Sequence, residues 1–537
     1  MTVVEVPVFL RPPAPHSSVS ATSVASGDRV AHGARRPGRR RSAVGAALGL
    51  ALILAGTLSA IRVAPHDPPS DEKSAAGIGG AQSAGSLAQV SLRPAASEPA
   101  VAAPERFDSG VLGLVSLSPD RWVAATGSDA NDGTQTRPWR TIQRAVDLTP
   151  ASGVITVRGG TYASFVIRRS GLIVQGAAGE VAVVSGGNYV VQIKGVSSAT
   201  VRSLTIANAP NQWGSGVRVE TSTNVLIEGN LIRDNKSFGI KVKDATNVRI
   251  ANNEIRKNNT GIELSGAVGG ASITDNRIHH NDRMVTSSRG GNGIVFTKTN
   301  GTVTVSNNKL WGNRARHLTD SGYDGGAFEV YGASDLKIIG NVMWDNNNVM
   351  ETGTDGSAPC SRITFARNVA YGAGTVVGET QGLILRCASS SLFANNTFDG
   401  IDTFAFYVSG SGSYAGSIAG LRIENNIVAR GRAYSLGKSI PTSVVIDHGL
   451  VQPGGSAAYA KYVAYVEGRG NTTSLAEFRA WTGYDRHGVQ ADPRFVDPGK
   501  RNYRLQTGSA AIDRGIVVLG GTIVGAAPDL GRFEWPG

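Results

Sequence analysis

Cysteine is scarce in this chain, which has two cysteines in 537 residues. So few cysteines exclude a disulfide-rich scaffold and a cysteine-rich metal protein. The formal net charge of +12 is not concentrated in a basic helix or in a nucleic-acid-binding motif. Residues 1–41 alone hold seven arginines against two carboxylates, so they contribute +5 of that charge. No nucleic-acid partner is therefore expected.

Three segments without the pattern of a folded domain open the chain. Residues 1–41 are rich in Pro, Ser, Ala and Arg and are expected to be a disordered cytoplasmic tail. The next twenty residues carry no charge. A helix of twenty residues is just long enough to cross a bilayer core of about 30 Å. Because arginines precede them, we predict a single-pass signal anchor, a transmembrane helix over residues 42–62, with the remainder outside the cytoplasm. A cleaved signal peptide, and hence a secreted protein, is the alternative. Residues 63–118, rich in Ala, Ser, Gly and Pro, should form a flexible linker.

A repeated asparagine organises the rest of the chain. Each copy precedes a short β-favouring pair, and successive copies lie 23 to 33 residues apart. The shortest spacing corresponds to one structural coil, and the longer spacings indicate loops inserted in some of the coils. Short strands with alternating apolar residues lie upstream of the first five copies. The eight positions are Asn230, Asn253, Asn276, Asn308, Asn341, Asn368, Asn396 and Asn426.

This pattern predicts an all-β fold, a single-stranded right-handed parallel β-helix over residues 119–460. Each coil is too small to bury its apolar face alone, so the coils stack and share one core. The asparagines are expected at corners, where this residue tolerates a left-handed backbone and can bond to its neighbours along the axis. A short helix from Thr141 to Leu148 should cap the open N-terminal end. Residues 461–537 should wrap and cap the other end.

Two stretches outside the repeat resemble a known superfamily. The string GSDANDGTQTRPWRTIQRA, which begins at Gly127, resembles the opening motif of the pectate-lyase-like parallel β-helix proteins. It is similar to the start of polysaccharide lyase family nine. The strings DPRFVDP and SAAIDRG near the C-terminus resemble a tail common in exported β-helix proteins. The resemblance implies an exported β-helix protein related to polysaccharide lyases, without assigning one family.

Three neighbouring coils carry long insertions that are rich in ionisable side chains. Insertions in adjacent coils emerge on one side of a solenoid and wall a cleft. Glu329 and Glu351 are 22 residues apart, one minimal coil, so their carboxylates are predicted to stack about 4.8 Å apart. Such carboxylates repel unless a cation or a proton lies between them. The predicted calcium ligands are Glu329, Glu351, Asp320, Asp324 and Asp355. The alternative is that Arg386 or Arg316 pairs with the glutamates and nothing binds.

The resemblance also implies a chemistry. Lyases of this fold act on uronic acids, where a metal neutralises the substrate carboxylate and a basic side chain removes the proton beside it. The chain lacks the four-aspartate cluster of family nine, and its glutamate pair is closer in kind to the alginate and chondroitin lyases of this fold. The expected partner is an acidic polysaccharide. The candidate base residues are Lys298 and His317, with Arg386 as charge stabiliser, and the candidate substrate contacts are Tyr331, Trp344 and Arg316.

Other readings stay open at this point. A glycoside hydrolase would need two carboxylates about 5–9.5 Å apart, which Asp324 or Asp345 with Glu329 could supply. An epimerase of the same fold, or a non-catalytic surface module that binds glycan or cell wall, is also compatible with the sequence. We expect a monomer.

The two cysteines point to an oxidising compartment. Cys360 lies eight residues before Asn368, and Cys387 lies nine before Asn396. They therefore occupy nearly equivalent positions in adjacent coils, within disulfide reach. A disulfide bond is predicted.

Overall fold

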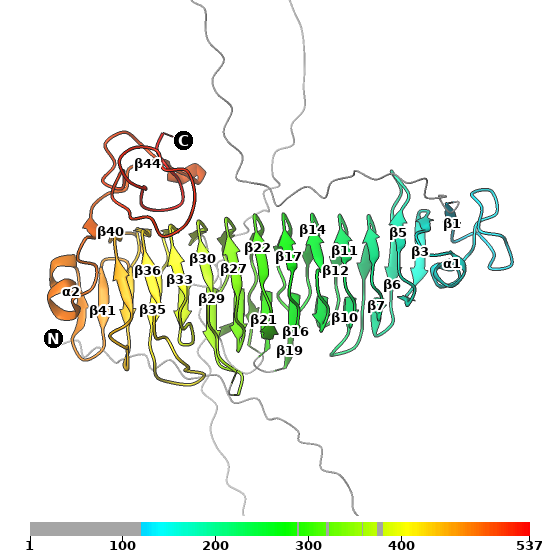
Figure 1. Cartoon of the computed structure of the whole chain (residues 1–537), viewed down its shortest axis with the longest axis horizontal. Helices are drawn as coiled ribbons and strands as arrows, with labels where there is room; N and C mark the ends of the chain where they lie inside the picture. Colours follow the sequence, from blue (N-terminus) through cyan, green and yellow to red (C-terminus); the bar gives the residue numbers. More distant parts are fainter. Residues whose placement is uncertain (1–119, 287–288, 318–321, 357, 373–379, 537) are drawn as a thin grey trace, which may run out of the picture. The chain divides into compact units, whose positions relative to one another are not determined.

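The fold is a stack of coils in which each turn of the chain contributes one strand to each of three sheets (Figure 1). The computed structural model describes residues 120–286, 289–317, 322–356, 358–372 and 380–536. The predicted tail, membrane anchor and linker lie outside these residues. No helix in the described ranges is long and apolar enough to cross a membrane.

Each of the three sheets has thirteen strands, and all neighbours pair in parallel except β41 and β42. The first sheet contains β1 (Arg121–Val123), β2 (Val154–Val157), β5 (Leu172–Gly176), β8 (Ala199–Arg202), β11 (Val225–Glu228), β14 (Arg249–Ala251), β17 (Ala271–Thr274), β22 (Val303–Ser306), β27 (Leu336–Ile339), β30 (Thr364–Ala366), β33 (Leu392–Ala394), β36 (Arg422–Glu424) and β39 (Val445–Asp447). The second sheet contains β4 (Phe165–Ile167), β7 (Tyr189–Lys194), β10 (Ser215–Glu220), β13 (Phe238–Lys243), β16 (Thr260–Ala267), β21 (Asn292–Asn300), β26 (Gly326–Tyr331), β29 (Asn348–Gly353), β32 (Gln381–Leu385), β35 (Phe406–Val408), β38 (Tyr434–Leu436), β41 (Ala464–Val466) and β42 (Gly470–Thr472). The third sheet contains β3 (Gly160–Ala163), β6 (Ala182–Ser185), β9 (Thr205–Ala207), β12 (Leu231–Arg233), β15 (Glu254–Arg256), β18 (Arg277–His279), β23 (Lys309–Trp311), β28 (Val342–Trp344), β31 (Val369–Tyr371), β34 (Thr397–Asp399), β37 (Ile427–Ala429), β40 (Leu450–Gln452) and β43 (Val489–Gln490).

Columns of apolar side chains run through the stack and form its core. Side chains alternate along a strand, so every second residue points inward, and register pairing stacks that residue on its equivalent in the next coil. In the second sheet this column is Val217, Ile240, Ile262, Ile294, Phe328, Met350, Leu383 and Phe406. All of these side chains are fully buried. Burial of stacked apolar surface is therefore what holds coil to coil.

The eight asparagines form a continuous buried ladder, as predicted. The side-chain amide and the backbone N–H of Asn308 both donate to Oδ1 of Asn341, each at 3.0 Å. Asn276 does the same to Oδ1 of Asn308, with both distances at 2.9 Å. These bonds satisfy amide groups that the stacked corners remove from water. A second buried ladder contains Asn235, Asn258, Asn281, Asn313 and Asn346.

The left-handed corner is displaced by one residue from the prediction. The residue before each ladder asparagine has the positive φ, because the asparagine itself must point its side chain inward to bond along the axis. These corner residues are Gly229, Asn252, Asp275, Asn307, Gly340, Arg367, Asn395 and Asn425.

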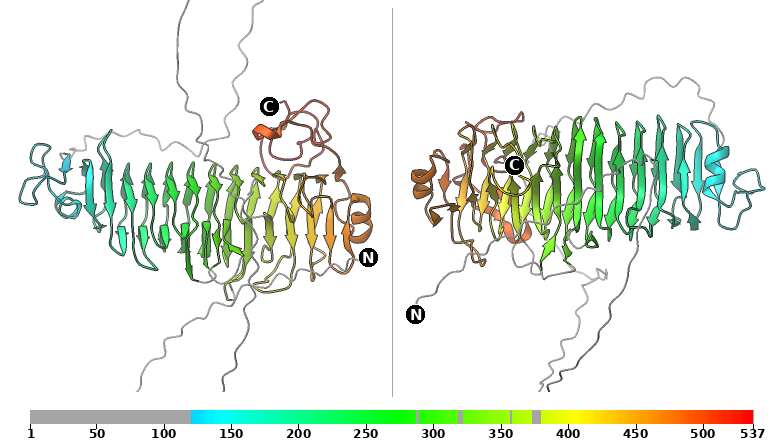
Figure 2. Two further views of the ribbon diagram at one scale, coloured as in Figure 1. Left: turned by 180° about the vertical axis from the view of Figure 1, so that it is seen from behind. Right: turned by 90° about the horizontal axis from the view of Figure 1, so that it is seen from below.

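Short helices cover both ends of the stack (Figure 2). The predicted capping helix is present as α1 (Ile142–Leu148), where Thr141 accepts a hydrogen bond from the backbone of Arg144 at 3.2 Å. Ile142 packs into the core, whereas Leu148 at the end of the helix is 44% exposed. At the other end, Phe478 of α2 (Leu475–Thr482) stacks on Tyr434 with ring centroids 5.0 Å apart.

The chain after β43 lies along a flank of the last coils (Figure 1). It contains the antiparallel pair β44 (Phe495–Asp497) and β45 (Asn502–Leu505), with a short 3₁₀ turn between them, η1 (Pro498–Lys500). Tyr503 and Leu505 pack with Tyr371 in a second apolar cluster, which lies outside the core of the β-helix. Strands β41, β42 and β43 fall within residues 461–537, so the coils continue into the segment predicted as a cap.

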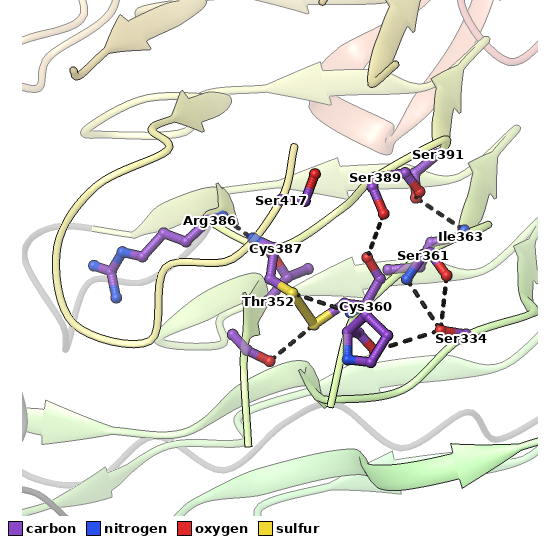
Figure 3. The surroundings of a disulfide bond; sticks show 12 residues. Ser334, Thr352, Cys360, Ser361, Ile363, Arg386, Cys387, Ser389, Ser391 and Ser417 are labelled. Carbon is purple, nitrogen blue, oxygen red and sulfur yellow. Dashed lines mark hydrogen bonds between the residues drawn. A yellow bond between two sulfur atoms is a disulfide. The ribbon is translucent and has the colours of Figure 1, made fainter. Parts of the chain in front are cut away.

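The predicted disulfide joins Cys360 and Cys387 in adjacent coils, with Cα atoms 5.3 Å apart (Figure 3). The hydroxyl of Thr352 accepts hydrogen bonds from the backbone N–H of Cys387 at 3.2 Å and of Arg386 at 3.1 Å. The disulfide and Thr352 therefore fix the segment that carries Arg386.

Replacing both cysteines by serine should lower stability. The bond closes a 27-residue separation, for which the loss of loop-closure entropy in the unfolded chain is worth about 3–4 kcal/mol. We expect a lower urea midpoint for the Cys360→Ser, Cys387→Ser variant than for the oxidised wild type. Wild-type protein treated with reductant is the matched control and should unfold at the variant's midpoint. Equal midpoints for oxidised wild type and variant would contradict the structural role.

Candidate functional site

Two stacked glutamates lie at the centre of the candidate site. Glu329 on β26 and Glu351 on β29 are register partners on the outward side of the second sheet, as their spacing predicted. In the same column, Val295 lies beside Glu329 in the preceding coil and Ile384 lies beside Glu351 in the following coil. Glu329 is buried, and the side chain of Glu351 is 15% exposed. Adjacent strands are about 4.8 Å apart, so two mostly buried carboxyl groups face one space.

A third carboxyl group reaches this space from an insertion. Asp324 belongs to β25 (Tyr323–Asp324), which pairs with β24 (Ala315–Arg316) in an antiparallel hairpin. Its Oδ2 accepts a hydrogen bond from Gly290 at 3.1 Å, in the neighbouring hairpin of β19 (Met284–Thr286) and β20 (Arg289–Gly290). Burial raises the pKa of Glu351; the charge of Arg386 opposes this rise and the charge of Asp324 adds to it. The hairpin insertions thus bring Asp324 to the glutamate pair.

Arg386 places a positive charge beside Glu351. It follows β32 and donates from Nη1 to Oε1 of Glu351 at 2.9 Å. Its side chain is 18% exposed, and the guanidinium lies 5.8 Å from the ring centre of Tyr407. A guanidinium stays protonated in proteins, so Arg386 suits the predicted role of charge stabiliser rather than base. Of the two arginines considered for pairing, Arg386 is the one that contacts Glu351.

Tyr331 lies two residues beyond Glu329 on the same face. Its register partner is Gly353, where a Cβ atom would lie 3.1 Å from the Tyr331 ring. The ring of Tyr414 approaches edge-on at 6.1 Å. Burial raises the pKa of Tyr331 well above its usual value, and the charges of Glu329 and Glu351 raise it further. The hydroxyl therefore holds its proton firmly at neutral pH and can donate a hydrogen bond.

Lys298 and Asp355 pair with each other. Lys298 lies at an irregularity of β21, with φ +49°, and its Nζ is 3.2 Å from Oδ1 of Asp355. Their side chains are 56% and 40% exposed. The structure thus joins a predicted base to a predicted metal ligand at the solvent-exposed edge of the site.

The remaining predicted residues of the insertions lie on the β24–β25 hairpin. His317 is partly buried, and its backbone N–H donates to Gly322 at 2.9 Å. Arg316 is exposed opposite Tyr323. Asp320 lies outside the residues that the structure describes.

Arg316 also lines a groove of about 650 Å³ beside the β19–β20 hairpin. Arg283 crosses this groove to Asp234, with Nη2 and Oδ1 2.9 Å apart. Its lining residues are Asn208, Ala209, Pro210, Asp234, Lys236, Asp282, Arg283, Met284 and Arg316. The lining residues come from several coils and share no motif that would identify them as a group in the sequence.

Trp344 lies on the third sheet, away from the outward side of the second sheet that carries the glutamates. Trp311 stacks on one face at 4.8 Å between centroids, and Tyr371 stacks on the other at 5.6 Å. Both ring faces are covered, so the structure places Trp344 in a packed aromatic column on another sheet and corrects its prediction as a substrate contact beside the glutamates.

Comparisons with known proteins agree with the fold. A family model described as "Right handed beta helix region" matches residues 170–349. No curated protein matches.

Among solved structures, XylC in complex with xylose is 13% identical with a TM-score of 0.47, covering 63% of this chain and 84% of that chain. Pectate lyase Pel9A is 17% identical with a TM-score of 0.46, covering 78% and 97%. An alginate lyase from Paenibacillus sp. str. FPU-7 is 15% identical with a TM-score of 0.34, covering 48% and 90%. The family match confirms a right-handed β-helix without a narrower family.

Proposed function

We propose that this right-handed β-helix protein cleaves an acidic polysaccharide by calcium-assisted β-elimination at the Glu329–Glu351 pair. The observation that carries the proposal is the register pairing of these two carboxylates in a largely buried space that Asp324 and Arg386 also reach. Like charges placed in this way need a cation or a proton between them. Attachment to the membrane through residues 42–62, with the β-helix outside the cytoplasm, is part of the proposal.

The oxygen donors suit calcium. The charges of Glu329, Glu351 and Asp324 all raise the pKa of Tyr331, which supports a common neighbourhood for the three carboxylates. A donor set made only of oxygen atoms matches the preference of this hard cation. Bound there, calcium would neutralise the substrate carboxylate and acidify the adjacent carbon-bound proton.

The side chains around the glutamates supply the other requirements. Arg386 holds Glu351 in place and adds a permanent positive charge where negative charge develops on the substrate. Tyr331 lies on the same face as Glu329 and carries its proton at neutral pH, as a phenol ordinarily does, so it can donate a hydrogen bond to the leaving glycosidic oxygen. Arg316 and Lys236, both exposed in the neighbouring groove, would bind carboxylates further along the chain of sugars.

Lys298 and His317 are the two candidates for the base, and one of them should be essential. General base catalysis contributes about 10²–10⁴-fold, so we expect one of the variants Lys298→Ala and His317→Ala to lose at least about 100-fold in kcat. The other variant should keep most of its turnover. Lys309→Ala, an exposed lysine on the third sheet, is the control. Near-normal kcat in both variants would exclude both residues as the base.

Turnover by the fragment from residue 106 onward tests the proposal. The substrates are pectate, alginate, glycosaminoglycans and bacterial exopolysaccharides, each with calcium and with chelator. We expect absorbance from new carbon–carbon double bonds with calcium and its loss with chelator. If the folded fragment turns over none of these substrates, the result would instead favour a non-catalytic glycan-binding surface protein.

A glycoside hydrolase is the second candidate, favoured by the raised pKa of Glu351. A carboxyl group with a raised pKa beside a second carboxyl group is the kind of pair from which glycoside hydrolysis draws its acid and its carboxylate. Asp345, which the sequence also offered, forms an ion pair with Arg314 instead. Reducing ends released without double-bond absorbance would establish this candidate.

A further inference from the structure

Three potential metal ligands converge where the last coil meets the C-terminal cap, defined here as α2 and residues 483–488. Asp447 ends β39, His448 follows it at the corner, and His487 comes from the cap. One ligand atom of each residue lies within 4.8 Å of the other two. Two imidazoles and one carboxylate are a donor set typical of zinc sites.

Asp447 is oriented as a metal ligand would be. Its Oδ1 accepts hydrogen bonds from the backbone N–H groups of His448 and His487, both at 2.8 Å. Its Oδ2 is hydrogen-bonded to Nδ1 of His487 at 2.7 Å and lies 3.7 Å from Nδ1 of His448, so both imidazoles face it. Hydrogen bonds that fix one oxygen and leave the other toward the site are the usual support of a ligating carboxylate.

His448 supplies a second, independent observation. Its Nδ1 is buried and has no hydrogen-bond partner within the described part of the chain. A buried polar atom without a partner is unfavourable, and a bound ion would offset this cost. His448 also has a φ of +53°, at the corner where earlier coils mostly place Gly, Asn or Asp. An imidazole is thus held at a strained corner with a nitrogen toward the cluster.

We propose that Asp447, His448 and His487 bind a divalent transition-metal ion, with zinc as the best match, and that this ion fastens the cap to the last coil. Zinc takes three protein ligands of this kind and completes its shell with water. The ligand atoms here are nitrogen and oxygen, whereas those of the cluster at Glu329 are all oxygen, which suits calcium. The cap closes the apolar end of the stack through Phe478, so the ion would stabilise that closure.

Zinc binding to the untagged, metal-stripped full chain tests this proposal by isothermal titration calorimetry. The variant Glu351→Gln serves as the reference protein, so that the other carboxylate cluster does not contribute. We expect one zinc ion per chain, and His448→Ala and His487→Ala added to this reference should each weaken binding by about tenfold or more. Arg486→Ala, an exposed neighbour in the same loop, should bind zinc like the reference.

A second readout reports on the cap itself. Zinc should slow proteolytic cleavage of the cap in the reference protein but not in the His487→Ala variant. His487 is 66% exposed, so its replacement should not unfold the chain. Zinc binding of equal affinity in the reference protein and in a variant that carries both His448→Ala and His487→Ala would overturn the proposal. The absence of any heat of zinc binding to the reference protein would also overturn it.

Discussion

Glu351→Gln should abolish turnover of the acidic polysaccharide while the chain stays folded. The amide has nearly the shape of the carboxylate but no charge, so it weakens any cation site and cannot exchange a proton as the acid does. We expect kcat to fall by at least about 100-fold, the loss typical of removing one electrostatic group from an active site. The measurement is initial rate at saturating substrate and calcium.

Stability should change little in this variant. Burial raises the pKa of Glu351, which means that the folded protein holds its charged form at a cost that glutamine removes. The amide oxygen can still accept the hydrogen bond from Arg386, so we expect a loss of no more than about 2 kcal/mol in unfolding free energy.

Glu263→Gln is the matched control. Glu263 belongs to the same outward column three coils before Glu351, is buried, and pairs with Lys241 at 2.7 Å. This substitution also removes a buried, paired glutamate charge, yet it should leave turnover intact. Normal turnover in the Glu351 variant, or an equal loss in the control, would contradict the assignment of the site.

Asn308→Ala should strongly destabilise the β-helix. Its side-chain amide donates to the carbonyls of Ile273 at 2.9 Å and Ser306 at 3.0 Å and to Oδ1 of Asn341 at 3.0 Å. Its Oδ1 accepts both donors of Asn276. Alanine leaves these buried groups without partners, and each such group costs about 1–3 kcal/mol, so we expect a loss of about 3–5 kcal/mol.

Urea unfolding followed by circular dichroism measures this loss. Lys309→Ala, at the adjacent exposed position, should change stability by less than about 0.5 kcal/mol. An Asn308→Ala variant as stable as this control would show that the ladder is dispensable for the stack.

The pairing of Glu329 with Glu351 was predictable because no insertion separates them. At a spacing of one minimal coil, the period of the solenoid fixes the register. Asp324 was predicted as a ligand only from its neighbourhood in the sequence. Its place depends on the β24–β25 hairpin, whose backbone pairing is independent of the coil period.

The error at Trp344 has a different cause. Tyr331 and Trp344 belong to one coil, but Tyr331 precedes Asn341 by ten residues and Trp344 follows it by three. The corner at this asparagine lies between them, so they point from different sheets. Position relative to the ladder, rather than membership of a coil, decides which face a side chain occupies.

Calcium titration by calorimetry, on the wild-type chain and on Glu329→Gln, tests the central claim most directly. The account predicts that the wild type binds one calcium ion at the carboxylate cluster and that the variant loses this binding. Binding should be unchanged in Glu263→Gln. An absence of calcium binding to the wild type, or equal binding in wild type and Glu329→Gln, would contradict a calcium site at the stacked glutamates.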